Sequence, residues 1–465
     1  MTHYDLAIIG SGSGNSLVTE DFADKRVAVI EKGTFGGTCL NVGCIPTKMY
    51  VHPADLAASV AHAERLGVDL RLDGVRWREI RDRIFGRIDP ISAGGRDYRR
   101  DADGTDLHEG TARFTGDREL EVTAADGSTA TVTADQIVIA TGSHTVVPDV
   151  FDGIVVHTSD TIMRLEDLPE RIVIVGGGFV ACEFAHVFSA FGSRVTQVQR
   201  GPHLLRHLDD DLSAAFTDRA LAQWDVRLNA TVTAVEPAVP GDTTHGATLT
   251  LSDGSRLEAD VVLVATGRLA TTAELDAKAG GVELREDGRV VVDAHGRTTA
   301  EGVWALGDAS SPFQLKHVAN HEARVVAHNL VHPEDLRSFA HDVVPAAVFT
   351  RPQLASVGLT EAEARAAGHD VTTKVQRYGD TAFGWAMEDT TSICKLVADR
   401  RTGLLLGAHL MGPQASTLIQ PIVQAMVTGL RADDMARDQY WIHPALTEVV
   451  ENALLGLDLA PRSAG

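Results

Sequence analysis

The sequence predicts an α/β protein with two similar parallel-sheet units, followed by a third unit that mixes strands and helices. Two apolar stretches, residues 4–9 and 171–175, each run into a glycine-rich turn. Two others, residues 134–139 and 259–264, each end in Ala-Thr-Gly. The two kinds of stretch alternate along the chain, which indicates that one plan occurs twice. From about residue 342 an alternating, strand-rich pattern begins without a further glycine turn of this kind.

Length and composition agree with several globular domains. A chain of 465 residues is too long for one ordinary core and predicts about three domains. The net charge of −22 argues against nucleic acid and anionic membrane surfaces as partners. No apolar run approaches the ~20 residues of a membrane span, and the N-terminus lacks a signal-peptide pattern. Because four cysteines are also too few for a secreted disulfide scaffold, we expect a cytoplasmic protein.

The first repeat carries the features of a dinucleotide-binding turn. Residues 10–15 (GSGSGN) follow a predicted strand, and a second strand, residues 26–30, ends at Glu31. Such glycines let backbone N–H groups approach a pyrophosphate, and an acid about 20 residues on can bind a ribose hydroxyl. We expect a short helix between the strands, although Asn15 replaces the usual third glycine or alanine. The predicted binding residues are Gly10, Gly12, Gly14, Asn15 and Glu31.

The second repeat has a Gly-x-Gly-x-x-Ala turn, which is typical of nicotinamide dinucleotide sites. This turn contains Gly176, Gly178 and Ala181. The next strand, residues 194–198, ends in Gln199-Arg200 instead of an acid, and Arg206 follows. An acid would bind the free ribose of NADH, whereas arginines can clamp the 2′-phosphate of NADPH. We therefore predict that Arg200 and Arg206 favour NADPH over NADH; the alternative is a solvated loop.

Residues 36–48 (GGTCLNVGCIPTK) contain two cysteines five positions apart. In a regular helix, residues five apart rise about 7.5 Å and face away from each other. A disulfide needs Cα atoms roughly 4.4–6.8 Å apart, so the segment must bend if the sulfurs pair. Gly43 would give backbone freedom, and Pro46 would move Ile45 away from helical geometry. The alternative is two buried, unpaired thiols, but so small a loop would stabilise the fold little, which favours redox turnover.

This whole stretch resembles the active-site signature of the pyridine nucleotide–disulfide oxidoreductases, and the resemblance extends from Gly10 to Glu448. It implies a glutathione reductase-like fold, with two Rossmann-like domains for FAD and NAD(P) and a C-terminal α+β dimerisation domain. The implied domains are residues 1–147 with 268–340 for FAD, 148–267 for NADPH, and 341–465 for the dimer interface.

The resemblance also implies roles for individual residues. Electrons would pass from FAD to a Cys39–Cys44 disulfide, with Cys44 as the charge-transfer thiolate and Cys39 as the thiol that attacks substrate. Lys48 and Glu183 would lie beside the flavin N5. Further cofactor contacts would come from Thr38, Ala140, Thr141, Gly142, Gly267, Gly307, Asp308, Lys316 and His317. The resemblance implies no metal site among these residues.

Residues 441–448 (WIHPALTE) contain a His-Pro-x-x-x-Glu pattern that the family also shows. An imidazole titrates near neutral pH and can protonate a leaving thiolate, while a carboxylate fixes its orientation. Pro444 would occupy the first turn of a helix, with His443 at its cap and Glu448 further on. The alternative is a simple cap or surface histidine. In the family this histidine comes from the partner subunit, so we expect a homodimer.

Residues 10–15, 314–324 and 377–389 most resemble the branch of the family that reduces mycothiol disulfide. Lipoamide dehydrogenase and glutathione reductase are the alternative branches, but the first should carry Glu where Gln199-Arg200 stands. A flavin-dependent quinone reductase or redox sensor would need neither the cysteine pair nor the histidine. The remaining cysteines, Cys182 and Cys394, are expected to be small buried residues.

Overall fold

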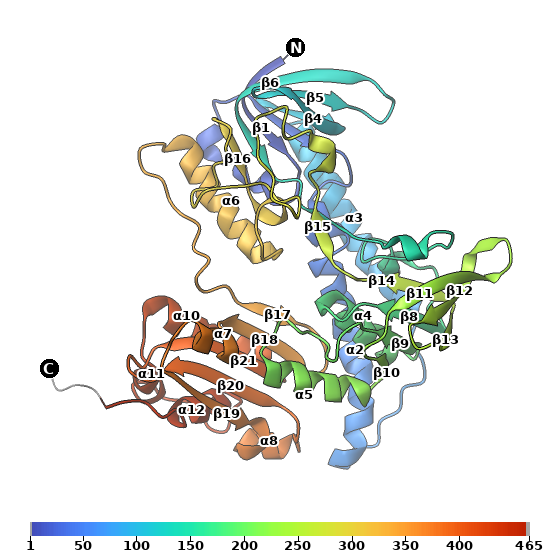
Figure 1. The fold of residues 1–465 in the computed structure, drawn as a ribbon, viewed down its shortest axis with the longest axis vertical. Helices are drawn as coiled ribbons and strands as arrows, with labels where there is room; N and C mark the ends of the chain where they lie inside the picture. The colour runs from blue at the N-terminus through green and yellow to red at the C-terminus, as the bar shows by residue number, and fades with distance from the viewer. Residues whose placement is uncertain (1, 462–465) are drawn as a thin grey trace.

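The computed structural model describes residues 2–461, apart from the side chains of residues 244 and 245. Its N-terminal sheet has the order β3-β2-β1-β6-β5-β4, with β16 also paired to β6 (Figure 1). The pairings among β1, β2, β3, β6 and β16 are parallel, and the β4–β5–β6 pairings are antiparallel. The strands are β1 Thr2–Ile9, β2 Val27–Glu31, β3 Thr105–Glu109, β4 Thr111–Gly116, β5 Glu119–Thr123, β6 Thr129–Ile139 and β16 Val303–Ala305.

The segment after the first glycine turn is not the expected helix. It forms two short 3₁₀ turns, Gly14–Leu17 and Glu20–Phe22, before β2 begins. The interval between β1 and β2, residues 10–26, is nearly as long as residues 176–193 of the second repeat, which hold α4, so its length does not account for the missing helix. Asn15 lies in the first of the 3₁₀ turns and therefore has no helix–strand packing role. Its side-chain oxygen instead accepts a hydrogen bond from Arg99 Nε at 2.7 Å, which ties the turn to a long helix.

The second repeat is a parallel sheet of order β10-β9-β8-β14. A three-stranded antiparallel sheet lies beside it, and a two-stranded ladder of β7 and β15 joins the segments that enter and leave this unit. The elements are β7 Ser143–Thr145, β8 Arg171–Val175, α4 Phe179–Ala190, β9 Arg194–Val198, α5 Asp210–Leu221, β10 Asp225–Arg227, β11 Val232–Val239, β12 Asp242–Leu251, β13 Arg256–Ala259, β14 Val261–Val264 and β15 Arg268–Ala270.

Four helices accompany the first sheet along the chain: α1 Gly37–Asn41, α2 Cys44–Ala63, α3 Trp77–Arg100 and α6 Lys316–Val331. The first two carry Cys39 and Cys44. A large apolar cluster joins α2 and α3 to α4 of the second unit. In it, Trp77 stacks on Tyr50 and on Phe188, with ring centroids 4.9 and 5.6 Å apart. This aromatic packing fixes the helix that begins at Cys44 against the second sheet's glycine-turn helix.

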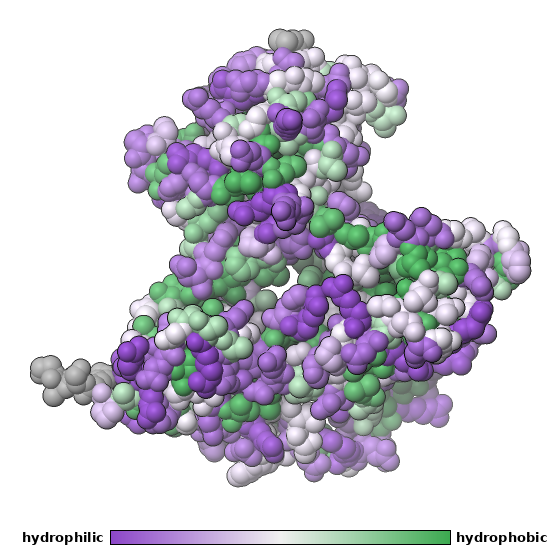
Figure 2. Space-filling model, viewed as in Figure 1, coloured by the Kyte–Doolittle hydropathy of each residue, from purple (hydrophilic) through white to green (hydrophobic). Residues whose placement is uncertain are grey.

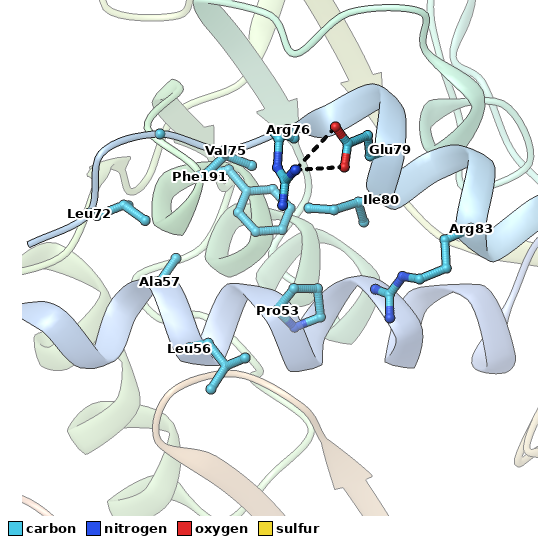
Figure 3. Close-up of a pocket in the computed structure, with 11 residues that line it drawn as sticks. Pro53, Leu56, Ala57, Leu72, Val75, Arg76, Glu79, Ile80, Arg83 and Phe191 are labelled. Carbon is cyan, nitrogen blue, oxygen red and sulfur yellow. Dashed lines mark hydrogen bonds and ion pairs between the residues drawn. The ribbon is translucent and has the colours of Figure 1, made fainter.

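A pocket of about 470 Å³ lies between α2 and the start of α3 (Figure 3). Leu56, Leu72 and Phe191 contribute apolar side chains to it, and an Arg76–Glu79 ion pair of 3.0 Å lies among its lining residues. None of the predicted site residues lines this pocket, so the candidate site is built elsewhere from glycine turns and the cysteine segment.

The C-terminal unit is an antiparallel sheet of order β17-β18-β21-β20-β19 with helices packed on it. Its elements are β17 Ala346–Val348, β18 Gln353–Gly358, α7 Glu361–Ala366, β19 Val371–Arg377, α8 Ala382–Ala386, β20 Ile393–Asp399, β21 Leu405–Gly412, α9 Ala415–Leu418, α10 Gln420–Thr428, α11 Ala432–Arg437 and α12 Thr447–Leu455. Figure 1 shows α5 of the second unit lying beside this sheet.

The predicted fold class is confirmed: two units with parallel sheets precede a mixed α+β unit. The return of β16 to the first sheet agrees with a discontinuous first unit, but the exact domain limits stay a prediction, and residues 1 and 462–465 lie outside the described chain. On the face drawn in Figure 2, hydrophobic residues gather at the narrow middle of the molecule, between the N-terminal sheet and the other two units.

Candidate active site

The two predicted redox cysteines lie on either side of a bend. Cys39 is in α1, Cys44 is the first residue of α2, and the chain turns between them at residues 42 and 43. Gly43 is needed there for close approach, because a Cβ atom would lie 2.9 Å from the carbonyl oxygen of Thr38. The bend that pairing of the sulfurs requires is therefore present.

The expectation that Pro46 moves Ile45 out of helical geometry is wrong. Both residues belong to the first turn of α2, which starts at Cys44. Amides of a first helical turn have no intrahelical acceptor, so the missing N–H of proline costs no hydrogen bond. The break between the cysteines instead lies at residues 42 and 43, before α2 begins.

Both thiols are free in this structure and hydrogen-bonded to each other. The Cys44 S–H donor lowers the pKa of Cys39 to about 7, against the opposing effect of burial. The charge of Lys316 and the backbone N–H groups of Cys44 and Ile45 add to this. The same hydrogen bond raises the pKa of Cys44, so the pair holds one thiolate, on Cys39, near neutral pH. The assignment of Cys44 as a charge-transfer thiolate stays a prediction.

Lys48 and Glu183 lie close to each other, but among the described residues they form no direct ion pair. Phe349, which follows β17, contacts both side chains. Its N–H donates to Glu183 Oε1 at 2.8 Å, and its ring faces the Lys48 ammonium. Burial raises the pKa of Glu183 to about 7 and lowers that of Lys48 to about 8. Phe349 was not predicted, because nothing distinguishes it within its apolar stretch.

The first glycine turn is packed against the end of β6. A Cβ on Gly10 would come within 2.3 Å of the Ala140 carbonyl oxygen, and Gly10 has φ +109°. A Cβ on Gly14 would come within 2.8 Å of Ile8 and 2.9 Å of the Ala140 side chain. Gly14 therefore supplies the close packing that a third glycine would supply in a longer motif.

Several groups around this turn fit a bound dinucleotide. The hydroxyl oxygen of Thr141 is buried and has no hydrogen-bond partner among the described atoms. At Gly12 only the Gly37 Cα lies near the position of an added Cβ, at 3.6 Å, so backbone N–H groups there can be approached closely. Glu31, at the end of β2, accepts from Ser11 and Gly33 through both carboxylate oxygens. The unpartnered hydroxyl of Thr141, the open position at Gly12 and the carboxylate of Glu31 at the strand end together match an FAD site.

The second FAD-type motif reaches the same region. Asp308 Oδ2 accepts from Ser143 Oγ at 2.7 Å, and Lys316 Nζ donates to Ser13 Oγ at 2.9 Å, inside the glycine turn. The Gly307 N–H donates to Glu322, and His317 contacts the carbonyl oxygen of Pro345 at 2.8 Å instead of the turn. The structure places the other predicted positions, Thr38 and Gly142, at an exposed helix start and a left-handed turn.

The second glycine turn repeats this geometry. Gly176 has φ +137°, and a Cβ there would come within 2.2 Å of the Ala265 carbonyl oxygen, as at Gly10. Ala181 is fully buried in α4, whereas the position of a Cβ on Gly178 is open. Gly267 closes the Ala-Thr-Gly strand end with φ +138°. The open N-terminus of α4 therefore fits a dinucleotide phosphate.

Arg200 and Arg206 are both exposed on the segment that follows β9, and within the described chain neither forms an ion pair. This segment is held against the glycine turn, because Leu205 N–H donates to the Gly177 carbonyl oxygen at 2.7 Å. Two uncommitted guanidinium groups beside the turn fit a 2′-phosphate.

His443 and Glu448 form the predicted pair: His443 Nδ1 lies 2.7 Å from Glu448 Oε1. The histidine side chain is 69% exposed and the glutamate 16%, so a half-buried carboxylate orients an accessible imidazole. The expected cap geometry is wrong, because α12 begins only at Thr447 and leaves Pro444 in the preceding turn. Neither residue contacts a cysteine of the same chain among the described residues.

A cysteine pair beside two glycine-turn sheets defines the class of dinucleotide-dependent disulfide oxidoreductases. Residues 4–323 match the family "Pyridine nucleotide-disulphide oxidoreductase", and residues 344–454 match its dimerisation domain. The chain belongs to this family. A relative called mycothione reductase, from Mycobacterium tuberculosis, is 56% identical, over 98% of this chain and 100% of its own.

More distant relatives share the same full-length architecture. A glutathione reductase from Burkholderia cepacia is 33% identical over 96% of this chain and 97% of its own. The solved copper(II) complex of the HOCl-induced flavoprotein disulfide reductase RclA from Escherichia coli superposes with a TM-score of 0.85. It is 29% identical and covers 98% of this chain and 99% of its own.

The predicted reaction class and cofactors are confirmed by this membership: the chain is an FAD- and NADPH-dependent disulfide oxidoreductase with a dimerisation domain. Within residues 2–461, no helix is long and apolar enough to cross a membrane, and no cluster of three metal-ligating side chains is present.

Proposed function

We propose that this protein reduces mycothiol disulfide to mycothiol with NADPH and so maintains the thiol redox balance of its cell. The observation that carries the proposal is the Cys39–Cys44 pair, at the bend of a chain that is 56% identical to a mycothione reductase over nearly its full length. The identity to a glutathione reductase over a similar length is 33%. The cytoplasmic location expected from the composition stays a prediction.

The cofactor positions follow from the two glycine turns. Glu31, Thr141 and Asp308 would hold FAD, with Lys316 beside Cys39. NADPH would bind at the N-terminus of α4, with its 2′-phosphate on the two arginines after β9. When bound, FAD supplies the transfer of two electrons from NADPH to the cysteine pair. The proposed division of labour is FAD binding by residues 1–147 with 268–340 and NADPH binding by residues 148–267.

The chain's own groups then carry out thiol–disulfide exchange. The Cys39 thiolate attacks one sulfur of the substrate, forms a mixed disulfide and expels the first mycothiol as a thiolate, which takes a proton from an imidazolium. Cys44 gives its proton to that imidazole, attacks the Cys39 sulfur and re-forms the internal disulfide. The second mycothiol leaves and takes the same proton. Lys48 and Glu183 would lie beside the flavin, where burial lowers the pKa of the lysine and raises that of the glutamate.

The imidazole in this scheme is His443 of the partner subunit. This proposal is supported by the dimerisation domain, by the 69% exposure of His443, and by two exposed apolar neighbours. Tyr440 is fully exposed and Ile442 is 74% exposed. Large apolar side chains beside an oriented histidine are typical of a surface that a second subunit covers. Residues 341–465 would form this interface.

The test is NADPH oxidation by the FAD-loaded protein with mycothiol disulfide, oxidised glutathione and lipoamide side by side. We expect mycothiol disulfide to be preferred by kcat/KM. A preference for lipoamide with NADH would refute both the substrate and the role of Arg200 and Arg206, while the disulfide reductase class would stand. Mixing a Cys39→Ser variant with a His443→Gln variant tests the interface, because only heterodimers would regain one intact site.

A further inference from the structure

A buried lysine of the C-terminal sheet ends at the NADPH-binding unit. Lys395, in the middle of β20, has a side chain that is 4% exposed. Its ammonium contacts Asp209 at 2.9 Å, Asp211 at 2.6 Å and Glu361 at 2.9 Å. An ammonium has three donors, so every one of them is used by a carboxylate. A buried charge is retained only with such complete pairing.

Asp209 is the residue on which this cluster converges. Its side chain is 2% exposed and caps α5 by accepting from Asp211 N–H, while its other oxygen accepts from Glu361 N–H at the start of α7. Burial would raise the pKa of Asp209, but the hydrogen bonds from Lys395 and the Glu361 amide bring it below its usual value. The carboxylate therefore stays charged and joins β20, α5 and α7.

The segment of residues 199–209, which ends at Asp209, carries Arg200 and Arg206, and neither arginine forms an ion pair within the described chain. Its first residues are fixed by Gln199, whose side chain accepts from Arg200 N–H and donates to the His203 carbonyl oxygen. Its middle is fixed on the glycine turn by the Leu205 N–H. Its last residue is Asp209, which makes the Lys395 contact. The structure thus anchors both ends and the middle of the segment, and one anchor comes from another unit.

The charges around Lys395 also indicate that this lysine supports the end of the segment. Three carboxylates lie together near a segment that is proposed to bind a phosphate, and anions repel one another. Lys395 neutralises one unit of this charge, and Arg365 pairs with Glu361 at 2.8 Å. The buried His409 lies directly opposite Lys395 on the adjacent strand, β21. Burial lowers the pKa of His409, so this imidazole adds no charge. Without Lys395 the cluster would present an unpaired buried acid to the segment's end.

We infer that Lys395 is a positioning residue for NADPH, because it fixes and neutralises the acidic end of the segment that carries Arg200 and Arg206. This inference rests on the proposed role of those arginines. It assigns part of the coenzyme preference to the C-terminal unit, through a residue that does not itself touch the coenzyme.

The experiment compares NADP⁺ and NAD⁺ binding by calorimetry on FAD-loaded homodimers of the parent, Lys395→Met, Lys395→Arg and Lys374→Met. Lys374 lies on the neighbouring strand β19 and takes no part in the cluster. We expect Lys395→Met to weaken NADP⁺ at least about fivefold, the lower range of typical coupling between two sites. NAD⁺ affinity and kcat at saturating NADPH should stay within about twofold. Lys395→Arg should recover part of the loss, and Lys374→Met should behave as the parent.

Equal losses for NADP⁺ and NAD⁺, or no loss in a folded Lys395→Met protein, would overturn the inference. Should that variant fail to fold, Lys395→Gln replaces it, because the glutamine amide can still donate to the Asp209 and Asp211 carboxylates but carries no charge. There the loss is again expected for NADP⁺ alone, and unchanged binding overturns the inference equally. A parent protein with no NADPH preference would instead refute the role of the arginines.

Discussion

Replacement of Cys44 should raise the pKa of Cys39 and so change how the exposed redox centre reacts with an alkylating agent. The Cys44 S–H is the largest cause of the low pKa of Cys39, about 7, while Lys316 and two helix N–H groups contribute less. In Cys44→Ala the donor is lost and the other groups remain. We therefore expect the pKa of Cys39 to rise by about one unit. The thiolate fraction at pH 7 would fall from about one half to about one tenth.

The assay is the pH dependence of iodoacetamide labelling at Cys39, followed by mass spectrometry of its peptide. The parent protein is first reduced with NADPH. The midpoint of the profile is the quantity to compare, because the nucleophilicity of a thiolate rises with its pKa and partly offsets the smaller thiolate fraction. Cys182 and Cys394 do not interfere: both are fully buried, and burial raises their pKa values to about 12.

Cys44→Ser is the matched control, since its hydroxyl can still donate to the Cys39 sulfur. Its midpoint should stay near that of the reduced parent, whereas the alanine variant's should move upward. A parent midpoint near the ordinary cysteine value of about 8.5, or the same midpoint in all three proteins, would refute the shared-proton account of this pair.

Three further predictions follow from the site and its packing. Glu448→Gln should lower kcat with mycothiol disulfide about 10- to 100-fold at an unchanged melting temperature, because the imidazole loses its orienting carboxylate. A variant as active as the parent would refute the orienting role of Glu448. Gly14→Ala should cost about 1–3 kcal/mol in chemical unfolding, since the methyl group meets Ile8 and Ala140, whereas Gly86→Ala, with open space in α3, should be neutral or stabilising. Replacing Arg200 and Arg206 together by alanine should raise the KM for NADPH at least about tenfold and leave that for NADH unchanged; parallel changes would contradict the 2′-phosphate role.

The two repeats could be predicted because local sequence determines them. An apolar strand followed by a glycine with positive φ leaves few alternatives. Gly10 and Gly176 each pack on the carbonyl oxygen of an alanine that follows the directly paired parallel strand, β6 or β14. The His443–Glu448 contact also follows from short spacing. These features depend on residues that are close in sequence or on backbone positions that only glycine tolerates.

The predictions from sequence were wrong where a general rule for a motif was applied without knowledge of how that segment packs in the fold. After the first glycine turn, 3₁₀ turns replace the expected helix although the interval is nearly as long as the one that holds α4, and Gly14 does the packing of the missing third glycine. Pro46 is accepted in a first turn, and Pro444 lies before α12 instead of within it. The contacts of Phe349 could not be predicted, because they join segments that are 166 positions apart in sequence.

The C-terminal unit contributes to both halves of the proposed reaction before any dimer forms. Phe349 contacts the Lys48 and Glu183 side chains, and Lys395 holds the end of the arginine-bearing segment. Both contacts come from one sheet, since Phe349 directly follows β17 and Lys395 lies in β20 of the same five strands. A rigid sheet that contacts both places restricts how far the NADPH-binding unit can move relative to the cysteine helix. The family's name for this unit describes dimerisation, whereas Phe349 and Lys395 lie against the groups of the other two units that are proposed to serve the flavin and NADPH.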